Sequence, residues 1–208
     1  MAKKIKSSFI NMVLTLMIIT MVASLALGSI YNLTLEPIRA AKKAAAERAI
    51  RLVLPAFDSL SSDTLWVRIP IDSTLADQGN GGQDSLQFFR AYKEGRLAGV
   101  AVATFSNQGY DPTQIQIMVG FRPDGVIDST VVTQQKETPG LGTKMTSPEF
   151  NGQFAGRDPA NFRLLVKKEG GDVDAITAST ISSNAVCDAL RRAYRTFESY
   201  KNEGGIEE

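Results

Sequence analysis

The feature that most constrains the fold is an uncharged, apolar run near the N-terminus. No charged residue lies between Lys6 and Glu36, and the segment from Phe9 to Ile30 consists mostly of Leu, Ile, Met, Val and Ala. About 20 apolar residues span the hydrocarbon core of a bilayer. The run therefore predicts one transmembrane helix, and the rest of the 208-residue chain is left to form a globular domain.

A cleaved signal peptide is the alternative interpretation of this run. Basic residues flank it on both sides: Lys3, Lys4 and Lys6 before it, and Arg39, Lys42 and Lys43 after it. The apolar core of a signal peptide is only about 7–15 residues long, so the length here favours an uncleaved anchor. The lysines favour a cytoplasmic N-terminal tail, although the charge contrast between the two flanks is small.

The composition of the chain excludes several classes of function. The net charge is +1, which leaves no sign of nucleic-acid binding. There is no histidine, and Cys187 is the only cysteine, so His-dependent catalysis, cysteine-ligated metal clusters and internal disulfides are excluded. No paired carboxylates or nucleotide-phosphate loop are recognisable. We therefore expect no catalytic residue and no metal site, and we expect Cys187 to be a packed core residue.

The central part of the chain predicts an antiparallel sheet. Five segments have strand character: Leu65–Ile71, Leu86–Lys93, Leu97–Phe105, Ile115–Phe121 and Val126–Thr133. We expect Phe162–Val166 to add a sixth strand. The turns Glu94-Gly95-Arg96 and Pro123-Asp124-Gly125 join neighbouring segments as hairpins. A run of hairpins indicates antiparallel pairing. Asp72 to Ser85 is rich in Gly, Asp and Ser and is expected to form a loop.

Two helices outside the apolar run complete the expected fold. The first covers Glu36 to Leu54, with Pro37 at its first position and with Ala44, Ile50, Val53 and Leu54 docked on the domain. The second runs from Ile181 to Tyr200 and is followed by a frayed polar tail. It packs on the sheet through an apolar stripe of Val186, Leu190, Ala193 and Phe197. We predict an α+β fold with three parts: residues 1–35 as tail and transmembrane helix, 36–60 as membrane-leading helix and linker, and 61–208 as the globular domain.

A hydroxyl-rich run directly precedes the C-terminal helix. The sequence from Asp174 to Thr180 places Thr177, Ser179 and Thr180 within four residues. Free backbone N–H groups and hydroxyls at a helix N-terminus suit an oxyanion such as phosphate. The alternative is a plain Ser/Thr helix cap.

This run resembles the flavin-attachment motif of the FMN-binding subunits of the Rnf and Nqr respiratory complexes. The family pattern is Asp-x-x-Ser/Thr-Gly-Ala-Thr, to which Asp174, Thr177 and Thr180 correspond, while Ala178 replaces the usual Gly and Ser179 the usual Ala. The resemblance implies that Thr180 carries FMN through a phosphoester bond. Ser179 is a competing acceptor.

A second stretch, Glu137 to Gly142, resembles the Glu-Thr-Pro-Gly-Leu-Gly loop of the same family. On its own it has the character of a surface turn, although its glycines would let the backbone approach a ligand closely. Further likeness lies in Gly120–Gly125 and Phe150–Phe154, and Gly109-Tyr110 is followed by Asp111-Pro112 where the family has another glycine. The implied cofactor-binding residues are Glu137, Thr138, Pro139, Gly140, Leu141, Gly142, Lys144, Thr177, Ala178, Ser179 and Thr180, with a solvated surface lysine as the alternative for Lys144.

The resemblance also implies a function. We expect a membrane-anchored electron carrier with covalent FMN, the G-type subunit of an ion-translocating ferredoxin:NAD oxidoreductase, rather than a complete enzyme. The C-type subunit of a sodium-translocating NADH:quinone reductase is the close alternative. The implied partners are the other redox and membrane subunits and a flavin transferase, and the domain is expected outside the cytoplasmic membrane. A non-relay flavin sensor or scaffold and a flavin-free interaction module are the remaining alternatives.

Overall fold

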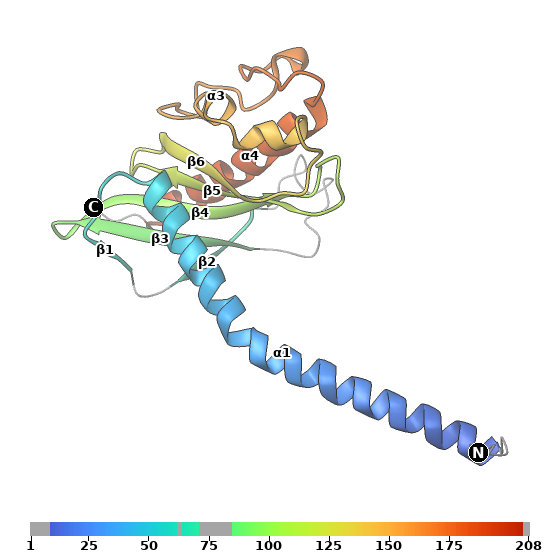
Figure 1. Cartoon of the computed structure of the whole chain (residues 1–208). Helices are drawn as coiled ribbons and strands as arrows, with labels where there is room; N and C mark the ends of the chain where they lie inside the picture. The colour runs from blue at the N-terminus through green and yellow to red at the C-terminus, as the bar shows by residue number, and fades with distance from the viewer. Residues whose placement is uncertain (1–8, 62–63, 71–84, 206–208) are drawn as a thin grey trace. The chain divides into compact units, whose positions relative to one another are not determined.

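The computed structural model describes residues 9–61, 64–70 and 85–205. The chain divides into two compact units, Met1–Ala45 and Ala46–Glu208, and we describe each by itself. The first unit contains most of helix α1, which runs from Phe9 to Val53 and ends within the second unit. All strands and the remaining helices belong to the second unit (Figure 1).

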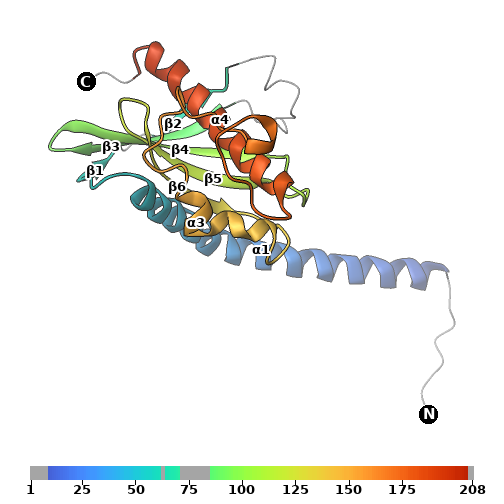
Figure 2. The same cartoon turned by 90° about the horizontal axis from the view of Figure 1, so that it is seen from above.

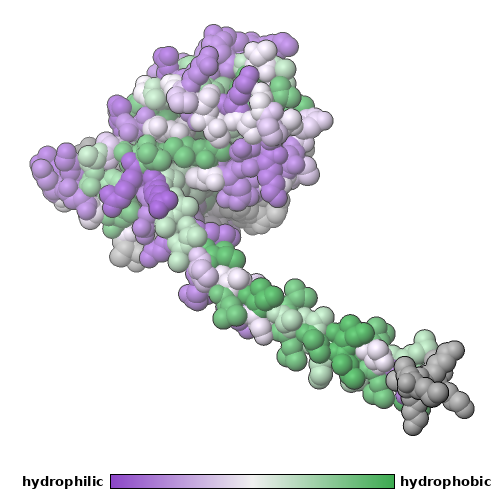
Figure 3. Space-filling view, in the orientation of Figure 1, coloured by the Kyte–Doolittle hydropathy of each residue, from purple (hydrophilic) through white to green (hydrophobic). Residues whose placement is uncertain are grey.

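Helix α1 is long and apolar enough to cross a membrane, by length and composition. Hydrophobic residues cover its N-terminal part in Figure 3. The expectation that a helix begins at Pro37 was wrong, because Pro37 lies inside the continuous α1. A proline inside a helix removes one N–H bond and crowds the carbonyl four residues earlier, yet α1 continues through Pro37. Glu36 is not a preferred N-cap residue, so Pro37 was the signal that suggested a helix start here.

The second unit is built on an antiparallel sheet, as the hairpin turns predict. Its strands are β1 (Ser59–Leu60), β2 (Leu65–Arg68), β3 (Ser85–Lys93), β4 (Arg96–Ser106), β5 (Ile115–Phe121) and β6 (Ile127–Gln134). The order is β1-β3-β4-β5-β6, and β2 pairs with β3 beside β1. Except for Ser85, which begins β3, the predicted loop from Asp72 to Ser85 lies outside the described residues.

Helix α4 (Thr180–Asn202) covers one face of this sheet, and the end of α1 covers the other (Figures 1 and 2). The α4 face holds the larger core, which includes Leu190 and Phe197 from the predicted apolar stripe. On the opposite face Ile50, Val53 and Leu54 are buried as expected, together with Ala49, whereas the predicted Ala44 is exposed and belongs to the first unit. The central strands are therefore buried on both sides.

The contact with α1 requires a glycine in β5. A Cβ atom on Gly120 would lie 1.8 Å from the backbone oxygen of Val53. The last turn of α1 therefore rests directly on the sheet backbone.

The segment between β6 and α4 contains only short helices and loops. These are η1 (Gly142–Thr146), α3 (Pro148–Asn151) and η2 (Lys167–Glu169). The predicted strand Phe162–Val166 does not form. Only Val166 makes an isolated bridge, to Val173. Leu164 and Val166 are buried in alternation, as a strand would have them, but the backbone bonds go to the returning segment at Asp172 and Val173 rather than to the sheet.

A charged pair lies buried between α4 and the sheet. Arg192 Nη2 donates to Asp188 Oδ2 at 3.1 Å, and both side chains are fully buried. Ser106 Oγ of β4 donates to the same carboxylate oxygen at 2.8 Å. The Arg192 guanidinium lies 4.5 Å from the centre of the Phe105 ring. Through the Ser106 bond, the pair joins α4 to β4 at the middle of the helix.

Cys187 lies beside this pair on α4. Burial raises the pKa of its thiol to about 12, which agrees with its predicted role as a core residue.

Candidate functional site

A cavity of about 590 Å³ opens at the N-terminus of α4, and we call it the α4 cavity. Its lining comes from the loop after β4, the loop after β6 and the start of α4: Tyr110, Glu137, Thr138, Leu141, Gly142, Ala178, Ser179, Thr180, Ile181 and Ser182. The hydroxyl run and the Glu137–Gly142 loop, which are separated by about forty residues in the sequence, therefore meet at this cavity.

The chain enters α4 through a tight turn. Ser179 N–H donates to the Ile176 carbonyl at 2.9 Å, and Ser183 Oγ accepts from Ile176 N–H while donating to the Ser179 carbonyl. Within this turn Ala178 has φ +61°. This left-handed conformation favours glycine, which explains physically why glycine is usual at this position of the motif.

The N-terminus of α4 has no side-chain cap. The first backbone hydrogen bond of α4 runs from the Ser183 N–H to the Ser179 carbonyl at 3.1 Å. The N–H groups of Thr180, Ile181 and Ser182 precede it and have no partner inside the helix. The plain-cap interpretation of the hydroxyl run is therefore wrong. These donors and the helix dipole make this end of α4 suited to an anion.

The structure distinguishes the two hydroxyls that compete as acceptors. Ser179 is only 8 % exposed, and its Oγ donates to Ser182 Oγ at 2.9 Å. Thr180 is partly exposed at the cavity, and no hydrogen bond to its hydroxyl is found within the described part of the chain. Thr180 is the more accessible of the two.

Glu137 lies at the centre of a buried hydrogen-bond network. Its Oε2 accepts from Ser182 Oγ at 2.7 Å, and its Oε1 accepts from the Asp111 N–H at 3.2 Å. The residue is 4 % exposed, and no ion pair among residues 9–61, 64–70 and 85–205 includes it. The carboxylate thus connects all three segments that line the cavity.

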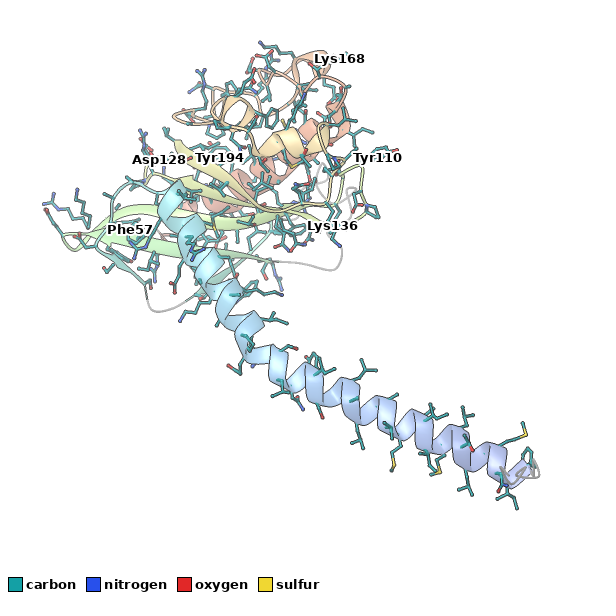
Figure 4. All side chains as sticks on the ribbon, in the orientation of Figure 1. Phe57, Tyr110, Asp128, Lys136, Lys168 and Tyr194 are labelled. Carbon is teal, nitrogen blue, oxygen red and sulfur yellow. The ribbon has the colours of Figure 1, made fainter. Side chains whose placement is uncertain are left out.

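The mouth of the cavity is apolar. Tyr110, Leu141 and Ile181 are 72 %, 40 % and 54 % exposed, and each lines the cavity. In Figure 4 Tyr110 and Lys136 lie at the end of the sheet away from Phe57 and Asp128. Exposed apolar side chains gathered around a hollow are typical of a ligand site.

The remaining predicted site residues lie beside the α4 cavity rather than in it. Lys144 and Thr177 line a neighbouring hollow of about 460 Å³, together with Asp174 of the motif, and we call it the Lys144 hollow. Asp174 is held there by Lys167 Nζ at 2.7 Å. Pro139 and Gly140 form the exposed turn of the loop, and Gly140 has φ +77°. The left-handed residue Ala178 turns the chain between Thr177 and Ser179, so the two lie on different sides.

Sequence reasoning missed three lining residues. Ile181 and Ser182 follow the hydroxyl run directly, and their proximity to Thr180 was the available signal. Tyr110 carried a signal in its Gly-Tyr pair, but nothing local indicated that the loop would reach α4.

The α4 cavity fits a flavin nucleotide. Its volume falls within the range of about 300–1,000 Å³ that is usual for small-molecule sites. The apolar mouth suits a flat ring system, and the uncapped helix end beside the Thr180 hydroxyl suits a phosphate. The residues present therefore match the two chemically different ends of FMN.

Comparison with known proteins agrees with this assignment. Residues 109–195 match the family model of the FMN-binding domain. This range contains the whole lining of the α4 cavity. The protein therefore carries an FMN-binding domain.

Similar proteins extend the comparison beyond this domain to most of the chain. The G subunit of the ion-translocating oxidoreductase complex of Methanosarcina acetivorans is 32 % identical over 184 residues, covering 88 % of this chain and 91 % of that protein. The G subunit of the Na(+)-translocating ferredoxin:NAD(+) oxidoreductase complex of Acetobacterium woodii is 32 % identical over 121 residues, 56 % of this chain and 58 % of that protein. The chain belongs to the family of these G subunits.

A solved structure shares the fold. The C subunit of the Na(+)-translocating NADH-quinone reductase of Parabacteroides distasonis aligns with a TM-score of 0.56 at 18 % identity, over 80 % of this chain and 96 % of that chain. The predicted combination of an apolar N-terminal helix, an antiparallel sheet and packed helices is confirmed.

Proposed function

We propose that the protein is a membrane-anchored electron carrier with FMN attached covalently to Thr180, the G-type member of an ion-translocating ferredoxin:NAD oxidoreductase complex. The observation that carries this proposal is the accessible Thr180 hydroxyl at the uncapped start of α4, inside a cavity with an apolar mouth. The family membership and the FMN-binding domain support it.

Attachment is a phosphoryl transfer in which Thr180 is the acceptor. Thr180 Oγ forms a bond to the phosphorus on the FMN side of FAD, the pyrophosphate bond breaks, and AMP leaves with the bonding electrons. The hydroxyl proton goes to a base of the flavin transferase, because Glu137, the carboxylate in the lining of this cavity, already accepts from Ser182 and Asp111. The N–H groups at the start of α4 would then stabilise the negative phosphoester by about 0.3–1 kcal/mol.

The bound flavin would supply the redox chemistry, and the protein supplies position and surroundings. Tyr110, Leu141 and Ile181 offer apolar contact for the ring, and Thr138 offers a hydroxyl at the cavity wall. Lys144 in the neighbouring hollow is a cation near the attachment turn. In this proposal electrons enter and leave through the exposed mouth.

Helix α1 anchors the domain in this proposal. We assign residues 1–35 to the cytoplasmic tail and the membrane span, 36–60 to a connecting segment and 61–208 to the flavin domain, on the extracytoplasmic side of the membrane. The apolar composition of Phe9–Ile30 and the membership in a family of membrane-complex subunits support the anchor. The other subunits of the complex are then its redox partners.

Flavin fluorescence after denaturing electrophoresis tests the attachment. The full chain and Thr180→Val are each co-expressed with a flavin transferase. We expect fluorescence at the mass of the native chain and none in the variant, with Thr133→Val, at an exposed threonine of β6, as the matched control that keeps its fluorescence. A native chain without fluorescence would contradict covalent attachment and favour a flavin-free module.

Electron transfer needs its own measurement. Membranes that contain the assembled complex are supplied with reduced ferredoxin, and the flavin absorbance of this protein is followed. We expect bleaching that is absent in Thr180→Val. A flavin that stays oxidised would contradict the carrier role and favour a sensor.

A further inference from the structure

Tyr110 lies at the cavity although its own side chain is 72 % exposed. An exposed side chain packs too little to hold a loop in place. The residue after Tyr110, however, donates its N–H to the buried carboxylate of Glu137, and the residue before it lies close to the same carboxylate. We propose that Glu137 is a positioning residue that fastens the Tyr110 loop to α4, so that Tyr110 covers the ring of the flavin attached at Thr180. This inference rests on the proposed function.

The Tyr110 loop and α4 are joined by two hydrogen bonds that one carboxylate accepts. Oε1 accepts from the N–H of Asp111, the residue after Tyr110, and Oε2 accepts from the hydroxyl of Ser182 in the first turn of α4. A carboxylate only accepts, so both partners must donate. Ser179 donates in turn to Ser182 Oγ, and the chain of bonds reaches the attachment turn.

Two glycines make room for this carboxylate. A Cβ atom on Gly109, the residue before Tyr110, would lie 2.5 Å from Glu137 Oε1. A Cβ atom on Gly142 would lie 2.6 Å from both Glu137 Oε2 and Ser182 Oγ. A larger residue at either position would force the Glu137 side chain or a neighbouring segment to move, and would so disturb the hydrogen bonds of the carboxylate. The positions of both glycines are therefore matched to the carboxylate between them.

The loop is also held after Tyr110. Asp111 Oδ1 accepts from the Thr113 N–H at 2.7 Å. Hydrogen bonds from the side chain and the N–H of Thr113 lower the pKa of Asp111. Pro112 lies inside this turn and restricts its backbone. At the near end, Ser106 Oγ accepts from the Gln108 N–H. With both ends of the loop held, the Glu137 contact decides where Tyr110 lies relative to the cavity.

The test measures how exposed the attached flavin is, in the full chain loaded by a flavin transferase. The readouts are flavin fluorescence and its quenching by iodide, because a covering aromatic ring lowers both the emission and the access of iodide. We expect Glu137→Ala to raise the iodide-quenching constant about two- to five-fold, as does Tyr110→Leu. The double variant should show no further increase, since both changes remove the same cover.

Two further variants separate positioning from general damage. Glu137→Gln keeps an acceptor for the Asp111 N–H and gains a donor toward Ser182, so it should restore most of the native shielding. Gly109→Ala keeps Glu137 and Ser182 in the sequence but pushes the carboxylate and the loop apart, so it should reproduce the effect of Tyr110→Leu. Gly109→Ala also keeps the test decisive if Glu137→Ala does not fold. Glu149→Ala in α3 is the control and should leave quenching unchanged.

The outcomes separate this inference from the proposed function. A native chain that carries no covalent flavin contradicts the proposed function. If the native chain carries flavin at Thr180 but Glu137→Ala and Gly109→Ala show the same iodide quenching as Glu149→Ala, the positioning role alone is contradicted. Additive increases in the Glu137→Ala/Tyr110→Leu double variant would also overturn it, because the two residues would then act independently.

Discussion

Helix α4 carries two buried serine–carboxylate contacts, one at its start and one at its middle, and they serve different purposes. At the middle, Asp188 accepts from Ser106 and is paired with Arg192. At the start, Glu137 accepts from Ser182 and lies beside a cavity, with no ion pair among the described residues. The same chemical pairing therefore joins the helix to the sheet in one region and shapes a ligand site in the other.

The energetic consequences of the two contacts should differ. Removing one partner of a fully buried ion pair leaves an uncompensated charge, which typically costs about 3–5 kcal/mol. Removing a carboxylate that holds only neutral donors leaves unsatisfied hydrogen-bonding groups, which cost about 1–3 kcal/mol. The first contact is mainly a matter of stability, and the second also determines the geometry of the site.

The largest expected effect is that of Asp188→Ala. We expect the free energy of unfolding of the flavin-free protein to fall by about 3–5 kcal/mol, because the buried Arg192 loses the carboxylate of Asp188. Urea unfolding followed by circular dichroism measures this. The control is Asp128→Ala, which breaks the partly exposed pair with Arg122 and should cost about 0–1 kcal/mol. Equal losses in the two variants would contradict a structural role for the buried pair.

Glu137→Ala should have a smaller effect on stability. We expect a loss of about 1–3 kcal/mol, because the Ser182 hydroxyl and the Asp111 N–H lose their acceptor. The same urea experiment compares it directly with Asp188→Ala. A loss as large as that of Asp188→Ala would remove the difference between the two contacts.

Ala178→Gly should stabilise the protein slightly. A non-glycine residue in the left-handed conformation costs about 1–2 kcal/mol, and glycine loses about 0.5–1 kcal/mol in backbone entropy, so a net gain of about 0–1.5 kcal/mol is expected. The melting temperature measures it. Glu94→Gly is the matched control, since Glu94 also has positive φ, at +51°, in the β3–β4 turn. A lower melting temperature for Ala178→Gly alone would show that the methyl group is needed at the site.

The smallest effect concerns Cys187, next to Asp188 on α4. Its raised pKa of about 12 means that the folded protein holds the neutral thiol, so ionisation of this group reduces stability only as pH rises above its ordinary value of 9.0. We expect thiol reagents at pH 8 to label Cys187 at least tenfold faster in denaturant than in buffer. Equal rates would indicate that the middle of α4 opens readily.

Local signals in the sequence predicted most of the fold. Alternating apolar residues and Gly-containing turns predicted the main strands, and Ile115–Phe121 agrees with β5 in both bounds. The α4 stripe was equally regular. The errors arose where local signals mislead: Pro37 resembled a helix start inside a continuous helix, and Phe162–Val166 alternates without a partner strand.

The site was predicted in part, because its motifs are local but their meeting is not. The hydroxyl run and the Glu137–Gly142 loop were both recognisable from sequence. The contact between Glu137 and Ser182 spans 45 positions, so no local pattern could show it. The turn at Ala178 similarly decides that Thr180 faces the α4 cavity and Thr177 the Lys144 hollow, and single-sequence reasoning does not give that orientation.

The most direct test of the account is to map the flavin on the chain. The full chain is co-expressed with a flavin transferase and digested, and the peptide that contains residues 177–182 is sequenced by mass spectrometry. We predict the mass of FMN, less one water, on Thr180 and on no other residue of that peptide. Flavin on Ser179, or an unmodified peptide, would contradict the assignment of the partly exposed Thr180 hydroxyl at the start of α4 as the attachment site.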